Sequence, residues 1–183
     1  LERPQEVHIY ALQGISSATS AQVEFDWSAH RRVDIRLAYR YVDAKTDRLS
    51  DPTLTWDPFV PRHRGFAQVS WASKVGNGGE QTRIDVTGQY IGEQRLPSTL
   101  SSPEPFQSLE QAPSFGQLNV QFSRDFSEAL GLYLGVENVT NVRQNRPIIG
   151  AAYDGEVVSQ QDFDAHFDAS LVYGPIFGRM VYG

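Results

Sequence analysis

Acidic and imidazole side chains alternate through the segment DFDAHFD. Asp162, Asp164, His166 and Asp168 are each separated from the next by one residue. In an extended segment all four side chains lie on one face, because successive side chains of a strand point to opposite faces. Carboxylate oxygens and an imidazole nitrogen are together suitable ligands for a divalent cation. The spacing is compatible with two hypotheses, a metal site and a polar, solvated loop. We expect the loop.

Basic and aromatic side chains occur together in the Pro-rich stretch between residues 46 and 63. Arg62 opens the run RHR directly after a proline, and Trp56 and Phe59 precede it. A guanidinium binds anions, and aromatic rings stack on sugars or on other rings. We therefore name four possible ligand-contact residues in the long connections: Trp56, Phe59, Arg62 and Arg95. The alternatives that we expect are ion pairing at a rim for the basic residues and packing of the loop for the aromatic ones.

The histidines do not indicate catalysis. The chain has four of them, His8, His30, His63 and His166. A hydrolytic site needs a serine or an aspartate within reach of a histidine, and the sequence gives none of the four such a partner. We expect no enzyme activity, no catalytic residue and no cofactor.

Composition excludes several classes of protein. None of the apolar runs approaches the ~18–20 residues that a transmembrane helix needs. The net charge of −6 argues against a nucleic-acid partner, which requires a basic patch. The chain has no cysteine, so disulfides and thiolate metal sites are excluded. The mean hydropathy of −0.40 leaves a transmembrane barrel open, because the alternating strands of such a barrel average out as polar.

The dominant pattern in the 183 residues is an alternation of apolar and polar residues with a period of two. It runs through SAQVEFDWSA (20–29), VDIRLAYRY (33–41) and the segments around 67–71, 84–90, 118–122 and 130–136. This period is typical of half-buried antiparallel strands. Since no segment of comparable length has the period of an amphipathic helix, the sequence predicts an all-β chain.

Short and long connections alternate strictly between these strands. Short turns are expected near residue 31, at 75–80 and at 125–128, and long connections rich in proline and serine at 46–63, 93–114 and about 151–177. An antiparallel up-and-down barrel in the bacterial outer membrane has this arrangement, with short periplasmic turns and long extracellular loops.

Aromatic residues mark both ends of the predicted strands. Those before short turns are Phe25, Trp27, Trp71 and Phe122, and those before long loops are Tyr39, Tyr41 and Tyr90. Such positions are typical of two interfacial girdles that flank a lipid-facing band. The charged residues between them would face a wet lumen. The length from Val33 to Tyr41, ~27 Å at ~3.4 Å per residue, nearly spans that band when the strand is tilted.

Two motifs near the end of the chain carry a family resemblance. The segments LYLGVENVTNVRQNRPIIGA (132–151) and FDASLVYGPIFGRMVYG (167–183) resemble the end of a TonB-dependent outer-membrane receptor, most of all the branch found in Bacteroidetes. The first motif is matched by Glu137, Asn138, Thr140, Asn141 and Arg143, and the second by Gly174, Pro175, Gly178 and Arg179. We expect the Asn138 segment to form a bulge or turn inside the penultimate strand.

The resemblance implies that residues 1–183 are the C-terminal portion of a barrel of about twenty-two strands. They would supply seven strands, from one at about residues 7–28 with a kink at Gly14 to a last one that begins at Arg179. The sequence contains no plug domain, and its last strand is short, so we expect a fragment of a larger receptor. The implied function is TonB-energised uptake of a scarce ligand: an iron–siderophore complex, a cobalamin, or a glycan or peptide.

The same resemblance implies the partners and the location. The partners would be the N-terminal plug, the remaining barrel strands, the TonB complex of the inner membrane, and the lipid and lipopolysaccharide of the bacterial outer membrane. Two alternatives stay open. One is a soluble β-sandwich that binds a ligand and whose apolar faces meet in a core; the other is an outer-membrane barrel enzyme such as a lipase or protease.

Overall fold

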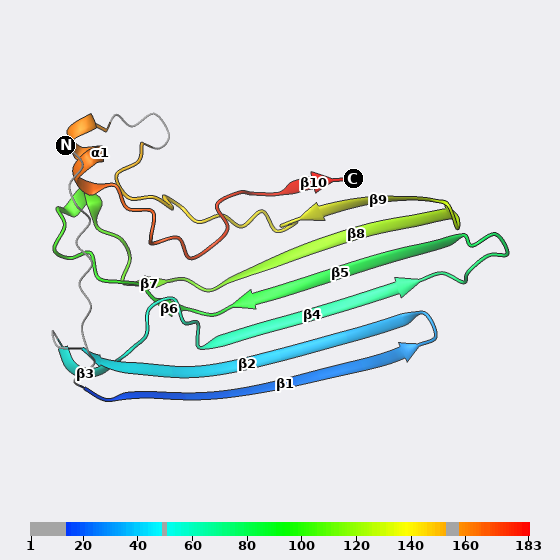
Figure 1. Cartoon of the computed structure of the whole chain (residues 1–183), viewed down its shortest axis with the longest axis horizontal. Coiled ribbons are helices and arrows are strands. Elements are labelled where there is room, and N and C mark those ends of the chain that lie inside the picture. Colours follow the sequence, from blue (N-terminus) through cyan, green and yellow to red (C-terminus); the bar gives the residue numbers. More distant parts are fainter. Residues whose placement is uncertain (1–13, 49–50, 153–157) are drawn as a thin grey trace.

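The computed structural model describes residues 14–48, 51–152 and 158–183 (Figure 1). Seven strands form the path of one antiparallel sheet, and neighbours along the path are also neighbours along the chain. In order they are β1 (Ser16–His30), β2 (Val33–Arg48), β4 (His63–Ala72), β5 (Gln81–Ile91), β8 (Phe115–Ser127), β9 (Leu130–Glu137) and β10 (Met180–Tyr182). The prediction of an all-β chain built from antiparallel strands is thereby confirmed for the described residues.

The remaining elements lie in the long connections. β3 (Asp51–Trp56) pairs with the distal part of β2, and β6 (Gln94–Arg95) pairs with β7 (Gln111–Ala112) in a small second sheet. A 3₁₀ turn, η1 (Glu104–Phe106), precedes β7, and the helix α1 (Gln160–His166) precedes β10. All these elements lie at the end of the main sheet that is on the left in Figure 1, and the short turns lie at the other end. The predicted alternation of short and long connections is confirmed.

Register places one apolar residue from each of the seven strands in a continuous row. Starting at β1, the row is Trp27, Ile35, Val69, Val86, Val120, Val136 and Val181. We call the face that carries this row the apolar face. β-Branched and aromatic residues pack well against cross-strand neighbours on a pleated surface, which explains why these segments form strands.

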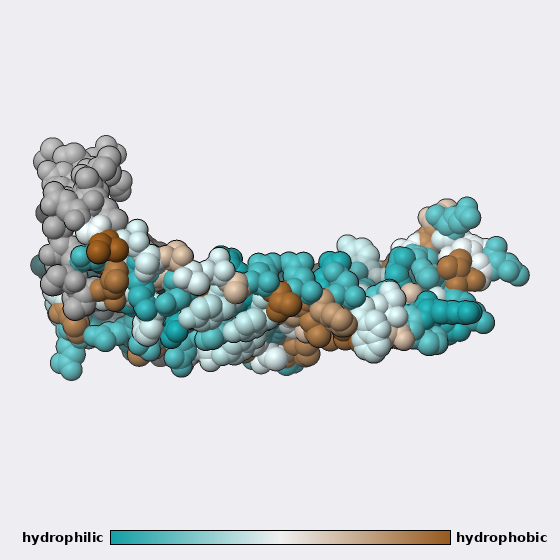
Figure 2. Space-filling view, turned by 90° about the horizontal axis from the view of Figure 1, so that it is seen from below, coloured by the Kyte–Doolittle hydropathy of each residue, from teal (hydrophilic) through white to brown (hydrophobic). Residues whose placement is uncertain are grey.

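The opposite face carries a polar row in the next register. Its members are Ser28, Asp34, Ser70, Asp85, Gln121 and Tyr182, with Gly135 between the last two. We call this the polar face. In Figure 2 hydrophobic side chains gather on the lower side of the middle of the sheet, whereas hydrophilic ones follow its upper side.

The apolar face is exposed. Val23 is 61% exposed, Trp27 53% and Leu132 63%. The fully buried hydrophobic residues of the described part are instead Leu96, Ala112 and Leu171, which lie among the long connections. The described residues therefore bury little of the apolar surface that the strands present.

Two stretches differ in local structure from the sequence expectations. The segment DFDAHFD, for which we expected a polar loop, is partly helical: Ser159 caps α1, accepting a hydrogen bond from Asp162 N through its side chain, and the helix runs to His166. The stretch 46–63 is not wholly loop, since β2 continues to Arg48 and pairs with β3. The part of the first predicted strand before Gly14 lies outside the described residues, and Gly14 itself lies in a bend before β1.

Candidate functional site

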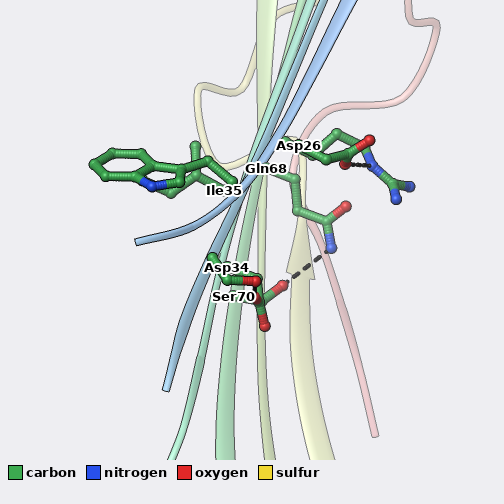
Figure 3. Close-up of a pocket in the computed structure, with 8 residues that line it drawn as sticks. Asp26, Asp34, Ile35, Gln68 and Ser70 are labelled. Carbon is green, nitrogen blue, oxygen red and sulfur yellow. Dashed lines mark hydrogen bonds and ion pairs between the residues drawn. The ribbon is translucent and has the colours of Figure 1, made fainter. Parts of the chain in front are cut away.

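The polar face is bound together by hydrogen bonds between neighbouring strands. Arg36 Nε donates to Asp26 Oδ1 at 2.6 Å, and Ser70 Oγ donates to Asp85 Oδ1 at 2.6 Å. Figure 3 shows the sheet on edge, with Asp26 and Gln68 on one side and Ile35 on the other. Because charged groups retain their hydrogen bonds here while remaining open to water, this face is suited to contact with water.

A cluster of cationic and aromatic side chains lies where β2 leaves the apolar band. We call it the rim cluster, and it consists of Tyr41, Asp43, Lys45, Trp56 and Arg62. Tyr41, Asp43 and Lys45 follow one another on the apolar face of β2, and β3 places Trp56 opposite Lys45.

Arg62 lies between two aromatic rings in this cluster. Its guanidinium carbon is 4.7 Å from the centre of the Trp56 ring and 5.9 Å from that of Tyr41, and its Nη2 donates to the Tyr41 hydroxyl at 3.3 Å. Such stacking attracts a cation and holds the planar guanidinium in one orientation. The Lys45 ammonium lies 5.5 Å from the centre of the Trp56 ring.

Asp43 is the carboxylate of the rim cluster. It accepts a hydrogen bond from the Trp56 indole at 2.8 Å and forms an ion pair with Lys45 at 3.2 Å. Arg62 Nε lies 3.9 Å from its Oδ1. The Trp56 indole, followed by the Lys45 ammonium, holds the pKa of Asp43 below its usual value. The expected pairing of Arg62 with a carboxylate is present, but its partner lies on the apolar face rather than among the lumen carboxylates.

An aromatic belt lies directly below the rim cluster. Tyr39 and His63 share a hydrogen bond of 2.7 Å between the hydroxyl and Nδ1, and their rings stack at 6.2 Å. His63 also contacts Tyr41, with ring centres 5.5 Å apart. The belt lies on the apolar face at the end of the long connections, where the sequence predicts one of the two girdles.

The structure brings together all four residues named as possible ligand contacts. Arg95 Nη1 donates to Trp56 O at 3.4 Å, and Phe59 N donates to Arg95 O at 2.9 Å. Phe59 has a φ of 61° and is 37% exposed, so it lies at a tight bend of the loop. The sequence did not indicate that β3 pairs with β2. This pairing places Trp56 next to Arg62.

The two C-terminal motifs meet at the base of the long connections. Asn138 is 2% exposed, and its side-chain nitrogen donates to Val142 O at 2.7 Å and to Phe177 O at 3.2 Å. Arg179 donates to Val139 O at 2.7 Å through Nη2 and to Asn141 Oδ1 at 3.0 Å through its backbone nitrogen. The predicted turn is present, and it follows β9 rather than interrupting it.

The other motif residues surround this turn. Glu137 pairs with Met180 in the β9–β10 register, Thr140 donates to Gly116 O at 3.2 Å, and the Arg143 side chain passes beside Gly178. A Cβ at Gly178 would collide with Asn141 Oδ1.

Gln144, outside the predicted set, holds the second motif from the other side. Its Oε1 accepts from Tyr173 N at 2.8 Å and from Gly174 N at 3.2 Å, and its backbone nitrogen donates to Pro175 O at 2.8 Å. The motif residues therefore fix β10 against β9.

A cavity of about 770 Å³ lies among the long connections. Phe106 of η1 and Ile149 contribute to its wall, together with Asp162 of α1 and with Tyr173. The Phe106 ring stacks on His166 with centres 4.2 Å apart, which joins two long connections that are distant in sequence. Burial raises the pKa of the Tyr173 hydroxyl above its usual value. The volume lies in the usual range for small-molecule sites.

The four residues considered for metal binding do not converge. In a helix, residues two apart point roughly 200° away from each other, so Asp164 points away from Asp162 and His166, which are four residues apart and share a face. Asp168 lies beyond the helix and pairs with Ile149 in an isolated bridge. Over the part of the chain that the structure describes, no group of three or more His, Asp or Glu residues is placed to hold a metal ion.

No family model, curated protein or solved structure with which the chain was compared matches it. None of the helices in the described ranges is long and apolar enough to cross a membrane.

Proposed function

We propose that this chain forms the C-terminal part of the barrel wall of a TonB-dependent outer-membrane receptor of the kind found in Bacteroidetes. The receptor would take up a scarce ligand, an iron–siderophore complex, a cobalamin, or a glycan or peptide, with energy delivered through the TonB complex. The chain would supply strands and extracellular loops, and the N-terminal plug would supply the gate. On this proposal the chain carries no catalytic residue.

The observation that carries the proposal is the apolar row across all seven strands, in which Trp27, Val69 and Val181 are exposed and the other four residues are half-buried, so that none of the row is covered by a core. A contiguous apolar surface of this kind on a protein in water marks an interaction site or a membrane contact. The opposite face is polar and hydrogen-bonded, which is the alternation of a lipid-facing outside and a wet inside. The grouping of all long connections at one end supports the same architecture.

The soluble-sandwich alternative has less support. A sandwich buries its apolar faces against each other, and within the described residues the small β6–β7 sheet is the only other sheet. That sheet has two residues in each strand, which is too small to cover the apolar row.

Ligand capture would take place at the long connections. The 770 Å³ cavity lies between two of them, which are held together beside it by the Phe106–His166 stack. Its wall combines apolar and aromatic side chains with a few polar groups, as ligand sites usually do. We propose this cavity as part of the extracellular ligand site.

The test is to express the complete encoded protein in a Gram-negative host, fractionate the membranes and purify it. We expect it in the outer-membrane fraction and monodisperse only in detergent, with β-rich circular dichroism. A monomer that stays in solution without detergent would contradict the proposal. In the native organism, deletion of the gene should abolish uptake of one labelled ligand among iron–siderophore, cobalamin, glycan and peptide candidates.

A further inference from the structure

Two arginines face each other across neighbouring strands of the polar face. Arg40 of β2 and Arg64 of β4 are register partners at the end of the sheet that carries the long connections, and both are exposed. We call them the arginine pair. Like charges directly opposite each other on a sheet are destabilising. The arrangement is therefore unfavourable unless an anion binds between the two side chains.

Two other arginines of the polar face each have a carboxylate on a neighbouring strand. Arg36 pairs with Asp26 at 2.6 Å, and Arg83 pairs with Asp125 at 2.8 Å. The arginine pair, by contrast, forms no ion pair and no side-chain hydrogen bond with the part of the chain that the structure describes. Its guanidinium donors are free for a ligand.

The charge at this level of the polar face is positive. On the described strands, Glu24 is the one carboxylate in the row of the arginine pair and in the next row toward the middle of the sheet. It accepts a hydrogen bond from the side chain of Gln22. The next register pair outward on β1 and β2, Ser20 with Val42, carries no charge. Two guanidinium groups therefore lie near one carboxylate that already has a partner.

Three apolar side chains interrupt the polar face beside the arginine pair. Ile91 is the register partner of Arg64, and Phe115 is that of Ile91. Phe66 lies two residues from Arg64 on the same strand, and so on the same face. All three are half-buried, and we call them the apolar patch. Apolar side chains gathered on a wet face indicate an interaction site, and here they adjoin two cations.

The apolar patch also adjoins the cavity that we propose as part of the ligand site. Gly174 lies against the Phe115 ring, so that a Cβ at Gly174 would be 3.6 Å from Phe115 Cε1. Tyr173, the preceding residue, lines the cavity, and its carbonyl oxygen accepts a hydrogen bond from Gln94 Nε2 at 3.3 Å. A ligand that leaves the cavity toward the polar face would therefore meet the apolar patch first and the arginine pair next.

We propose that the arginine pair and the apolar patch bind the transported ligand through an oxyanion, a carboxylate or phosphate group, that is attached to an apolar or aromatic group. Two guanidinium groups bind an oxyanion through charge-assisted hydrogen bonds, and the bound anion offsets their mutual repulsion. The patch would contact the apolar part of the same ligand. This inference rests on the proposed function and narrows it to anionic ligands.

The experiment uses the complete protein in detergent micelles and measures the binding of small probes by saturation-transfer NMR. The probes are phenylacetate, its neutral amide phenylacetamide, and acetate, which has the oxyanion without the ring. We expect phenylacetate to bind at least about tenfold more tightly than the amide, because hydrogen bonds between charged groups are stronger than neutral ones. Acetate should bind severalfold more weakly than phenylacetate, since it has no apolar part to contact the patch.

Variants assign the site. Arg40→Gln with Arg64→Gln should weaken phenylacetate binding at least about tenfold and leave phenylacetamide binding unchanged. Phe66→Gln should weaken the binding of both. The matched control is Arg83→Gln, because Arg83 lies on the same face nearer the short turns and pairs with Asp125. It removes the same charge and should leave the binding of both probes unchanged. Comparison in the same micelles cancels the partitioning of the probes into detergent.

Three results would overturn the inference: no binding of phenylacetate at millimolar concentration, equal binding of phenylacetate and its amide, or a double variant that binds phenylacetate as tightly as Arg83→Gln does. Should the double variant fail to fold, as judged by circular dichroism, Arg40→Gln and Arg64→Gln decide singly, each with an expected severalfold weakening. Failure of the proposed function looks different, because the protein would then be monodisperse without detergent, whatever its affinity for phenylacetate.

Discussion

Asn138 uses both ends of its amide in the turn that joins the two C-terminal motifs. Its nitrogen donates to two carbonyl groups, and its Oδ1 accepts from Val142 N at 3.0 Å. Its φ of 51° lies in the left-handed region, which asparagine tolerates better than most residues. Asn138 therefore has two roles. Its side chain forms hydrogen bonds with buried backbone groups, and its backbone adopts the left-handed conformation that brings these groups within reach.

We predict that Asn138→Ala lowers the free energy of unfolding by about 1–3 kcal/mol, because it leaves buried polar groups without partners. The measurement is denaturant unfolding in micelles. Asn138→Gly should lower the free energy of unfolding somewhat less than Asn138→Ala. Glycine adopts the positive φ without strain, but it does not replace the lost hydrogen bonds. Asn77→Ala, in an exposed short turn, is the control, and an equal effect of Asn138→Ala and Asn77→Ala would contradict the role assigned to Asn138.

At the scale of a strand, β5 offers a comparison between the two faces of the sheet. Val86 lies in the apolar row, between Val69 and Val120, while Thr87 lies on the polar face beside Gln68 and Asn119. The two residues are adjacent, so they share their position along the sheet, and on the proposed function they would also share their depth in the membrane. Their response to a charge should therefore depend on the face alone.

We predict that Val86→Arg destabilises the protein in bilayers by about 2–4 kcal/mol, as expected for a cation on a lipid-facing site near the midplane. Thr87→Arg should cost much less, because its side chain enters the wet side. Unfolding in lipid vesicles with guanidinium chloride measures both. Equal costs would show that the apolar face does not contact lipid.

The strands could be predicted from the sequence because each is long and alternates strictly. A period of two fixes both the element and the face, so the apolar row follows once register is known. β3 could not be found this way, because its stretch is rich in proline. It pairs with β2 off the path of the sheet, and such an edge position is where proline in a strand is tolerated.

The site was harder to predict than the strands. Trp56 and Arg62 are recognisable as residue types, but their contact with Asp43 and Lys45 depends on the β2–β3 register. The α1 segment reads as alternating, and its seven residues are too few for a helical period to show. The stack of Phe106 on His166 beside the cavity joins segments 60 residues apart, and no local pattern indicates such a contact.

On the scale of the whole molecule, the sheet ends in two edges. Among the described residues β1 and β10 each pair on one side only. β1 has 15 residues, all of them exposed, and its row of backbone groups on the free side is long. A long free edge is a hazard in water and costs several kcal/mol per unpaired group in hydrocarbon. If the apolar face contacts lipid, this edge must therefore be paired in the functional protein.

This leads to a prediction about β1 in the complete protein. We expect amides of β1 that point away from β2 to exchange slowly in bilayers, as slowly as those that point toward it, because a further strand pairs with them. Hydrogen exchange with residue-level detection measures this, and the amides of β5, which is paired on both sides, give the protected reference. Rapid exchange of alternate β1 amides, with β5 protected, would mean that the sheet stays open at β1 and that the barrel does not close through this edge. Slow exchange throughout β1 would support closure by strands beyond the described sheet, since the opposite edge offers only the three residues of β10 for pairing.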